Sequence, residues 1–291
     1  MEKIDEILKA NMRGLNKKYN MECRICQKDF CTNEYFDRTC SEECKKKFDI
    51  EREKENERQR IKNNTHHCQY PTCKKEFYNE TYGIKYCSGE CEEKHTKEIA
   101  IENRERFICT VIPKKYHLIE SDHKDTVNKY NGGSIFITGE VGAGKTVLMA
   151  SIAKKIIRNT KSPLGQPIDW ISYPSFIMEL QNMFRKDFDY DEYGKKAKIQ
   201  TTPFDVAEKI AKYEGVLCID DIGSEKLTEY VRQITYFIIN EREQRVLSTM
   251  ITSNFSLAQI DEMIDSRISS RIAGMCETIK LVGKDRRLLK G

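Results

Sequence analysis

One stretch decides the fold of this chain: Ser134-Ile-Phe-Ile-Thr-Gly139-Glu-Val-Gly-Ala-Gly144-Lys145-Thr146-Val-Leu-Met-Ala150. Its first residues predict a short apolar strand, its glycines a turn, and its small and apolar residues a helix. From Gly139 to Thr146 it matches the phosphate-binding pattern G-x-x-x-x-G-K-T at every fixed position. A strand before this pattern and a helix after it are the context that it requires. We therefore prefer a phosphate-binding loop (P-loop) to a glycine-rich surface turn.

The residue types of this loop fit a nucleotide. Its glycines allow the backbone to turn N–H groups toward a phosphate chain, and the helix adds its positive end. Lys145 is expected to reach the β- and γ-phosphates, and the Thr146 hydroxyl to hold Mg²⁺. The nucleotide-binding residues predicted here are Gly139, Glu140, Val141, Gly142, Ala143, Gly144, Lys145, Thr146 and Val147.

The composition limits the class of protein. The 291 residues allow about two domains. A net charge of +4 is too small to identify a nucleic-acid binder. No apolar run approaches the ~20 residues that span a bilayer, and the N-terminus lacks the pattern of a signal peptide. We expect a soluble cytoplasmic protein with no membrane partner.

Nine of the twelve cysteines lie within the first 91 residues. A reducing compartment argues against disulfides and in favour of metal. The cysteines form two units that superpose at an offset of 47 residues, with Phe30 on Phe77 and Cys40-Ser41 on Cys87-Ser88. Four thiolates per unit suit tetrahedral structural Zn²⁺. The predicted ligands are Cys23, Cys26, Cys40 and Cys44 in the first unit, and Cys68, Cys73, Cys87 and Cys91 in the second.

Some ligand choices stay open. Cys31 is an extra thiol in the first unit, and His66 and His67 precede the second. Any of these three is able to replace a predicted ligand. Ser41 or Ser88 is expected to cap the helix that closes its unit.

The domain organisation follows from these patterns. The zinc units are expected at residues 21–47 and 66–95, within an N-terminal domain of residues 1–106. Between them, residues 45–64 are mostly charged, with pairs of opposite sign three residues apart. This spacing predicts an exposed spacer helix, with disorder as the alternative. A second domain is expected at residues 107–291.

The second domain carries further chemistry after a buried apolar strand, predicted at residues 215–219. Asp220 and Asp221 follow it, which is the Walker B arrangement: Asp220 to hold Mg²⁺ through water and Asp221 to orient the attacking water. Asn254 follows a strand predicted at residues 248–252 and is expected to contact the γ-phosphate or the water. Further strands are predicted at residues 169–173 and 278–282, and a helix at 176–185 with Ser175 as a candidate cap.

Two arginines, Arg267 and Arg271, lie one turn apart on a predicted helix. A solvated face or a structural salt bridge is the ordinary interpretation of such a pair, so it identifies no site by itself.

Residues 107–291 resemble the AAA+ ATPase domain of the DnaC/DnaI-type helicase loaders and the related IstB-like transposition ATPases. Six segments carry the resemblance in the family's order. They are Ile112–Tyr116, Gly139–Thr146, Ile219–Lys226, Thr249–Asn254, Arg267–Arg271 and Gly283–Arg287.

The resemblance implies an α/β P-loop fold, a parallel sheet flanked by helices with a reduced lid, and ATP hydrolysis with ATP and Mg²⁺. Asn254 would be sensor 1, and Arg271 an arginine finger acting on the ATP of a neighbouring subunit, with Arg267 as its helper. The segment 112–116 would flank the base. Asp221 stands where many AAA+ proteins have Glu, and Arg286 and Arg287 are weak candidates for sensor 2.

The resemblance also implies partners. DnaI-type loaders carry a zinc-containing N-terminal domain that grips the helicase. The leading hypothesis is an ATP-switched protein that loads a ring-shaped, hexameric replicative helicase onto single-stranded DNA and self-associates through its ATP sites, in a bacterial cell or a phage-infected host. One alternative is an IstB-like transposition helper, although those proteins generally lack a zinc-rich front end. Another is a non-enzymatic adaptor, which the set of Lys145, Asp220, Asn254 and Arg271 argues against.

Overall fold

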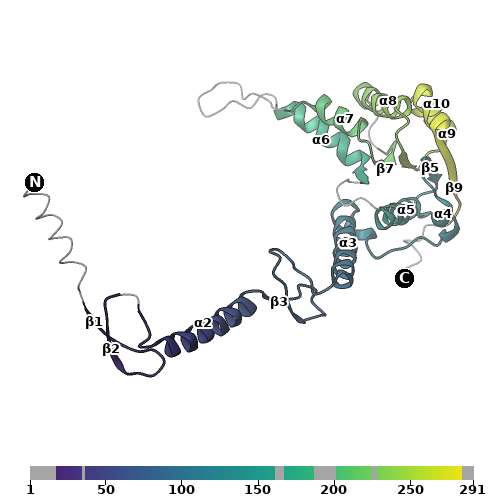
Figure 1. Cartoon of the computed structure of the whole chain (residues 1–291). Coiled ribbons are helices and arrows are strands. Elements are labelled where there is room, and N and C mark those ends of the chain that lie inside the picture. Colours follow the sequence, from purple (N-terminus) through teal and green to yellow (C-terminus); the bar gives the residue numbers. More distant parts are fainter. Residues whose placement is uncertain (1–17, 35–36, 161–166, 187–200, 225–227, 284–291) are drawn as a thin grey trace, which may run out of the picture. The chain divides into compact units, whose positions relative to one another are not determined.

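The computed structural model describes residues 18–34, 37–160, 167–186, 201–224 and 228–283 (Figure 1). The chain divides into two compact units, Met1–Lys97 and Glu98–Gly291. We call them the front unit and the rear unit. The division falls within helix α3 (Gly89–Val111), nine residues before the boundary expected at residue 106, which stays a prediction.

The front unit repeats one arrangement twice, a short antiparallel hairpin followed by a helix. The expected spacer helix over residues 45–64 is present as part of α2, and none of the residues of α2 is buried. Exposed ion pairs support it, for example Arg58 with Glu55 at 3.8 Å. In chain order the elements are β1 (Tyr19–Glu22), β2 (Asp29–Thr32), α2 (Glu42–Asn63), β3 (Thr65–His67), β4 (Glu76–Tyr78) and α3.

The rear unit is built on a five-stranded sheet in which all neighbouring strands are parallel. The strand order is β6-β7-β8-β5-β9, so the P-loop strand β5 is separated from the Walker B strand β7 by β8. This parallel sheet flanked by helices is the predicted P-loop AAA+ fold. The strands are β5 (Ser134–Gly139), β6 (Ile168–Ser172), β7 (Val216–Ile222), β8 (Thr249–Ser253) and β9 (Cys276–Leu281).

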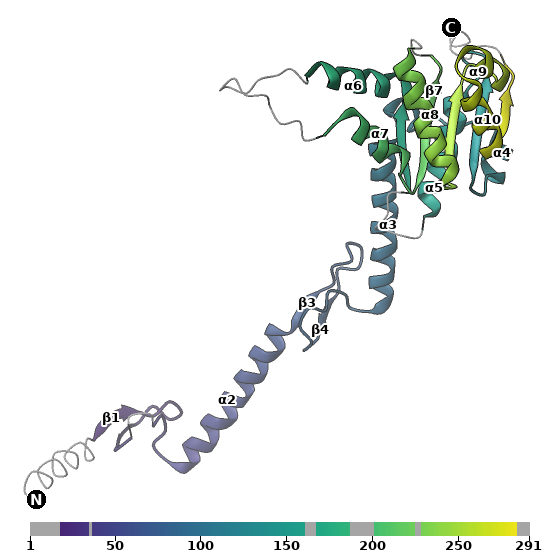
Figure 2. The same cartoon turned by 90° about the horizontal axis from the view of Figure 1, so that it is seen from above.

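Helices cover both faces of this sheet (Figure 2). Alternation along the strands produces two apolar cores: Phe136 and Ile219 belong to one, whereas Ile135, Ile137 and Cys218 belong to the other. The first core takes residues from α6 (Tyr173–Lys186), α7 (Pro203–Ala211), α8 (Glu229–Gln244), α9 (Leu257–Met263) and α10 (Ser266–Met275). The second takes residues from the end of α3, from α4 (Lys124–Lys129) and from α5 (Lys145–Asn159).

Two details differ from the sequence-based expectations. Helix α6 begins at Tyr173, so Ser175 lies inside its first turn and is not the cap. Helix α7 was not expected, although Thr202 and Asp205 form a capping box at its start. That pattern was legible in the sequence and would have revealed the helix.

The last described residues follow β9 directly, and within the described ranges no helical subdomain follows that strand. The candidates Arg286 and Arg287 lie outside the described residues. No helix in the described part of the chain has the length and apolarity needed to cross a membrane.

Candidate nucleotide site and cysteine clusters

The P-loop connects β5 to α5 through glycines in conformations that other residues rarely adopt. Gly139 has a φ of 151°, and a Cβ on it would lie 2.2 Å from the carbonyl oxygen of Leu281 on the neighbouring strand. Gly144 caps α5 with a φ of 95°. Glycine is therefore required at Gly139 by close packing and is favoured at Gly144 by the backbone turn.

Lys145 lies at the centre of the site and is 7% exposed. Its ammonium group donates to the carbonyl oxygens of Gly139 (2.9 Å) and Glu140 (2.8 Å), and to Oδ1 of Asn254 (2.7 Å). The lysine thus spans the P-loop and reaches the end of β8. The structure brings together two residues that the sequence predicted separately, 109 positions apart.

The two Walker B aspartates lie inside β7, which continues to Ile222 beyond its expected end at residue 219. The pairing of β7 with β8 shifts register between Ile219 and Ile222, and Asp221 has a φ of 65°. At this irregularity two successive residues, Asp220 and Asp221, line the same cavity, whereas successive residues of a regular strand point to opposite faces. A non-glycine residue at positive φ is strained, and such strain concentrates at functional sites.

Each aspartate contacts a different part of the site. Asp220 accepts hydrogen bonds from the hydroxyls of Thr146 (2.9 Å) and Thr252 (2.7 Å). Asp221 accepts one from Nδ2 of Asn254 at 2.9 Å. Burial raises the pKa of Asp220, and the two hydroxyls oppose that rise. A buried carboxylate beside a hydroxyl is an oxygen donor set that suits Mg²⁺.

Thr252 is a site residue that the sequence analysis did not identify. Its hydroxyl also accepts from the backbone N–H of Asp221 at 2.8 Å, so it fixes both aspartates against β8. It is 1% exposed. A hydroxyl within a buried apolar strand, two residues before Asn254, was the available signal.

Lys145, Thr146, Asp220, Asp221 and Asn254 line a cavity of about 630 Å³. Of the predicted P-loop residues, Gly139, Glu140 and Ala143 do not line it. The remaining wall was not predicted in full, because the resemblance implied only residues up to Tyr116. The lining residues are Lys115, Tyr116, Ile119, Glu120, Asp122, Val141, Gly142, Gly144, Lys145, Thr146, Val147, Asp220, Asp221 and Asn254.

Arg271 does not line this cavity. Its guanidinium pairs with the carboxylate of Glu243, donates to the Tyr236 hydroxyl at 3.0 Å, and lies 5.2 Å from the centre of the Tyr236 ring. Arg267 lies 4.8 Å from the same ring and pairs with Asp265 at 2.7 Å. The two arginines therefore share one aromatic support on α8.

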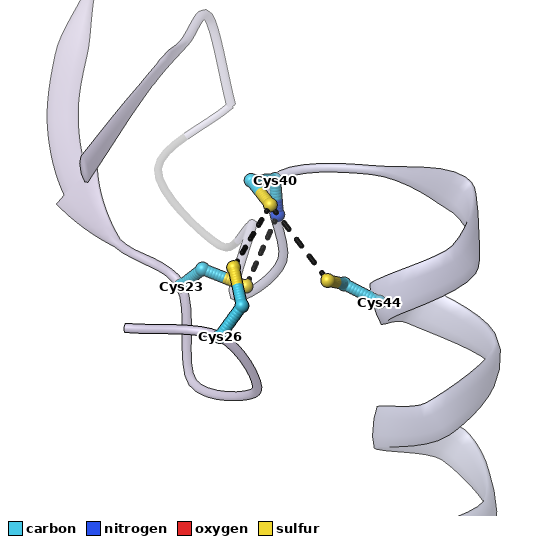
Figure 3. A group of neighbouring side chains, drawn as sticks. All are labelled: Cys23, Cys26, Cys40 and Cys44. Atoms are coloured by element: carbon cyan, nitrogen blue, oxygen red, sulfur yellow. Dashed lines mark hydrogen bonds between the residues drawn. The ribbon is translucent and has the colours of Figure 1, made fainter. Parts of the chain in front are cut away.

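The eight predicted cysteines form two clusters of four, and in each cluster the sulfur atoms lie within 4.8 Å of one another. In the first cluster, Cys40 Sγ lies 3.4 Å from Cys26 Sγ and 3.7 Å from Cys44 Sγ (Figure 3). A Zn–S bond of about 2.3 Å in tetrahedral geometry places sulfurs about 3.8 Å apart. The cluster therefore fits Zn²⁺.

The second cluster repeats these distances, with Cys87 Sγ 3.4 Å from Cys73 Sγ and 3.5 Å from Cys91 Sγ. The backbone agrees as well. The N–H of Cys87 donates to Cys68 Sγ at 3.5 Å, as that of Cys40 donates to Cys23 Sγ at 3.4 Å.

The helix caps also repeat. Ser41 and Ser88 each accept from the N–H of the last cysteine of their cluster, at 3.2 and 3.3 Å. The repeat seen in the sequence is thus a repeat of hydrogen bonds.

The three alternative ligands lie elsewhere. Cys31 is exposed and pairs with Asn20 across the first hairpin. The ring of His66 lies 5.9 Å from that of Phe77, and Nε2 of His67 lies 3.5 Å from Glu76. Within the described residues, neither four-cysteine group includes any of these three side chains.

No family model matches the sequence. A curated relative does: the chain is 28% identical over 180 residues to the replicative helicase loader DnaI of Bacillus subtilis. The chain resembles the DnaC/DnaI-type helicase loaders. The match covers 56% of this chain and 51% of DnaI, so the chain spans about half the length of that relative.

Solved structures with similar folds include three replication proteins. They are DnaI (22% identity, TM-score 0.41, covering 70% of this chain and 88% of that one), the DnaC helicase loader (21%, 0.44, 58% and 100%) and AMPPCP-bound DnaA from Aquifex aeolicus (17%, 0.44, 60% and 53%).

Proposed function

We propose that this protein is an ATP-dependent loader of a ring-shaped replicative helicase on single-stranded DNA. One observation carries the proposal: Lys145, Asn254 and Asp221 form a continuous hydrogen-bonded chain, and all three line a nucleotide-sized cavity. This arrangement occurs in a chain whose curated relative is a replicative helicase loader.

The residues of the site divide the chemistry. Lys145 exchanges its carbonyl and amide partners for phosphate oxygens, and the N-terminus of α5 adds backbone N–H groups. Thr146 and Asp220 would hold Mg²⁺, which would supply positive charge to neutralise the phosphates. Asn254 orients Asp221, because its amide donates to that carboxylate. Asp221 in turn orients the water that attacks the γ-phosphate.

Arg271 acts on the nucleotide of a neighbouring copy. Its absence from the cavity of its own chain supports this role, and to act there its guanidinium exchanges Glu243 and the Tyr236 hydroxyl for phosphate oxygens of the neighbouring copy. Arginine fingers supplied in trans raise rates by on the order of 10³-fold or more. ATP hydrolysis by the isolated protein is therefore slow and rises when copies align on DNA or on the helicase.

The two cysteine clusters bind Zn²⁺, and the domain of residues 1–106 that they organise grips the helicase. Four cysteines per ion leave no open coordination position, so the metal is structural. A cytoplasmic location keeps these thiols reduced before the metal binds.

The decisive experiment measures loading. The replicative helicase of the encoding organism is mixed with protein-coated single-stranded DNA, and duplex unwinding is followed with and without this protein and ATP. We expect unwinding to require both. Lys145→Ala should abolish it through loss of ATP binding, whereas Asp221→Asn should bind ATP without hydrolysing it.

A mixture of two inactive variants tests the trans role. Arg271→Ala lacks the finger and Lys145→Ala lacks the nucleotide site, so a mixed assembly pairs some intact sites with intact fingers. Partial return of ATPase activity supports the proposal. A mixed assembly as inactive as either variant would show that Arg271 has a structural role only.

ATP-dependent binding to duplex DNA, with no contact to the helicase, would instead favour the transposition helper.

A further inference from the structure

We propose that Lys154 is a positioning residue for the bound nucleotide, because it fixes a wall segment that lines the same cavity as the P-loop. This wall segment comprises residues 115–122, five of which line the cavity. The inference rests on the proposed nucleotide binding. It adds a residue that acts through the wall segment and does not itself contact the phosphates.

Lys154 lies on α5, nine residues after Lys145, and its side chain is completely buried. Its ammonium group donates to the carbonyl oxygens of Ile119 (2.6 Å), Tyr116 (3.2 Å) and His117 (3.4 Å). It also pairs with Glu120 at 2.8 Å. Lysine is almost never fully buried unless it is paired. Here all the partners of one buried charge belong to the wall segment.

The same face of α5 adds two further anchors. The hydroxyl of Ser151 accepts from the backbone N–H of Ser121 at 2.8 Å, and both residues are buried. Arg158 lies 3.7 Å from Glu120 and makes two hydrogen bonds with Glu105. Contacts one turn apart therefore hold the wall segment along the helix that starts at the P-loop.

This arrangement links two parts of the cavity lining through one helix. The first turn of α5 carries Lys145 and Thr146, and later turns anchor the wall segment, which lines the same cavity. With phosphates bound at the P-loop as proposed, the wall segment is left to meet the rest of the nucleotide. Since the wall segment has only a single-turn 3₁₀ helix, Lys114–Tyr116, its position depends on side-chain anchors. Without Lys154, the carbonyl oxygens of Tyr116, His117 and Ile119 lose a charged donor, and the wall is ordered for a smaller fraction of time.

Lys155 supplies a matched control on the same helix. Its ammonium group also donates to three carbonyl oxygens, those of Val127, Asn128 and Tyr130. None of these three residues lines the cavity. Lys154 and Lys155 thus hold different segments through the same kind of contact, although Lys154 is fully buried and also pairs with Glu120, whereas Lys155 is only partly buried.

The test compares two probes, ATP and inorganic tripolyphosphate, each with Mg²⁺, on the full-length protein. Tripolyphosphate contacts the P-loop but has no nucleoside to meet the wall. In Lys154→Met we expect the dissociation constant for ATP to rise about tenfold, as when only a tenth of the population keeps a competent wall. The constant for tripolyphosphate should be unchanged. Lys155→Met should leave both constants at wild-type values.

Hydrogen exchange provides the structural readout. Amides of the wall segment should exchange faster in Lys154→Met, while those of the P-loop keep their wild-type rates. In Lys155→Met the faster exchange should be confined to residues 127–130. Lys154→Gln, which keeps a polar but shorter side chain, replaces Lys154→Met if that variant does not fold.

The outcomes separate the two proposals. Wild-type protein that binds neither probe overturns the nucleotide site itself. Wild-type protein that binds ATP, together with a folded Lys154 variant of equal ATP affinity, overturns only the role of Lys154. Equal loss of both probes also overturns it, because that result indicates general damage to α5.

Discussion

The front and rear units reach order by different physical routes. Among the described residues of the front unit, the buried side chains counted as hydrophobic are only Cys23 and Cys68, both predicted metal ligands. The rear unit buries two extensive apolar clusters on the two faces of its sheet. In the front unit, clusters of four cysteines therefore occupy the place that apolar cores have in the rear unit.

The difference follows from size. Each four-cysteine unit of the front, with about 30 residues, cannot bury enough apolar surface to offset the entropy of ordering its backbone. Units of this size depend on metals or disulfides. The rear unit is large enough to fold around side chains, which leaves its polar groups available for a site. Loss of zinc should therefore unfold the front unit, whereas loss of nucleotide should only lower the stability of the rear unit.

The largest expected effect is removal of zinc. A strong chelator should release about two Zn²⁺ per chain and abolish order in both front hairpins, because structural zinc supplies roughly 10 kcal/mol or more of apparent folding energy. Metal analysis and calorimetry check this, and the thermal transition of the rear unit should not move.

Single substitutions refine that test. Cys87→Ser should lose one metal ion, whereas Cys31→Ser, an exposed cysteine outside the clusters, should keep both. If metal analysis found no zinc in carefully purified protein, the front unit would not depend on metal for its fold, and the contrast with the rear unit would be wrong.

The second effect breaks the rear unit through its core. Arg242 is fully buried and donates to Thr249 Oγ1 at 2.7 Å and to the carbonyl oxygens of Tyr213 (2.9 Å) and Ser248 (2.7 Å). Arg242→Met removes a donor from each of these acceptors and should cost about 3–5 kcal/mol, because every buried acceptor left unsatisfied costs about 1–3 kcal/mol. Thermal melting measures the loss.

Arg245 is the control for this prediction, since it is half-exposed and pairs with Glu241 at 3.1 Å. Arg245→Met should cost under about 1 kcal/mol. Zinc content should be unchanged in both variants. Metal loss in Arg242→Met would show that the two units do not fold independently.

The third effect is ligand stabilisation confined to the rear unit. ATP with Mg²⁺ at a hundred times its dissociation constant should stabilise this unit by about 2.7 kcal/mol. The measurement is the shift of its thermal transition, which Lys145→Ala should abolish. A similar shift of the zinc-dependent transition would argue that nucleotide reaches both units.

The smallest effect concerns Asp220. Burial raises the pKa of this carboxyl group above its usual value of 3.8. The folded state therefore favours the protonated acid. The free energy of unfolding should fall as the pH rises from the unfolded pKa of 3.8 through the higher pKa of the folded state. Above both, the ionised carboxylate costs folding energy. Asp220→Asn should then raise the nucleotide-free stability of the rear unit by about 1 kcal/mol, as relief of a strained functional site does.

Melting at two pH values tests the sign of this effect. The gain from Asp220→Asn should be present at pH 7 and shrink toward pH 3, where the acid is protonated in both states. Magnesium-dependent ATP binding should weaken in the same variant. A variant that is less stable at pH 7 would show that the hydrogen bonds of Asp220 outweigh its burial.

Sequence patterns were sufficient wherever neighbours along the chain create the feature. Examples are the P-loop from Gly139 to Thr146, the eight cysteines and the exposed helix α2, all of which depend on short spacings. Element ends were less accurate, since β7 continues through Asp221 to Ile222. A bulge depends on how two strands pair, which no single strand encodes.

The sequence by itself determined which chemical groups the protein possesses: a phosphate loop, two Walker B acids, Asn254 and two sets of four thiols. Tertiary structure decided which of them meet, because the order β6-β7-β8-β5-β9 places β8 beside both β5 and β7. That order joins Lys145 to Asn254 and Thr252 to Asp220, and packing on α5 lets Lys154 reach the wall segment. Tertiary structure also places Arg271 outside the cavity of its own chain. Such contacts join residues far apart in sequence, and only the packed sheet and helices bring them within hydrogen-bonding distance.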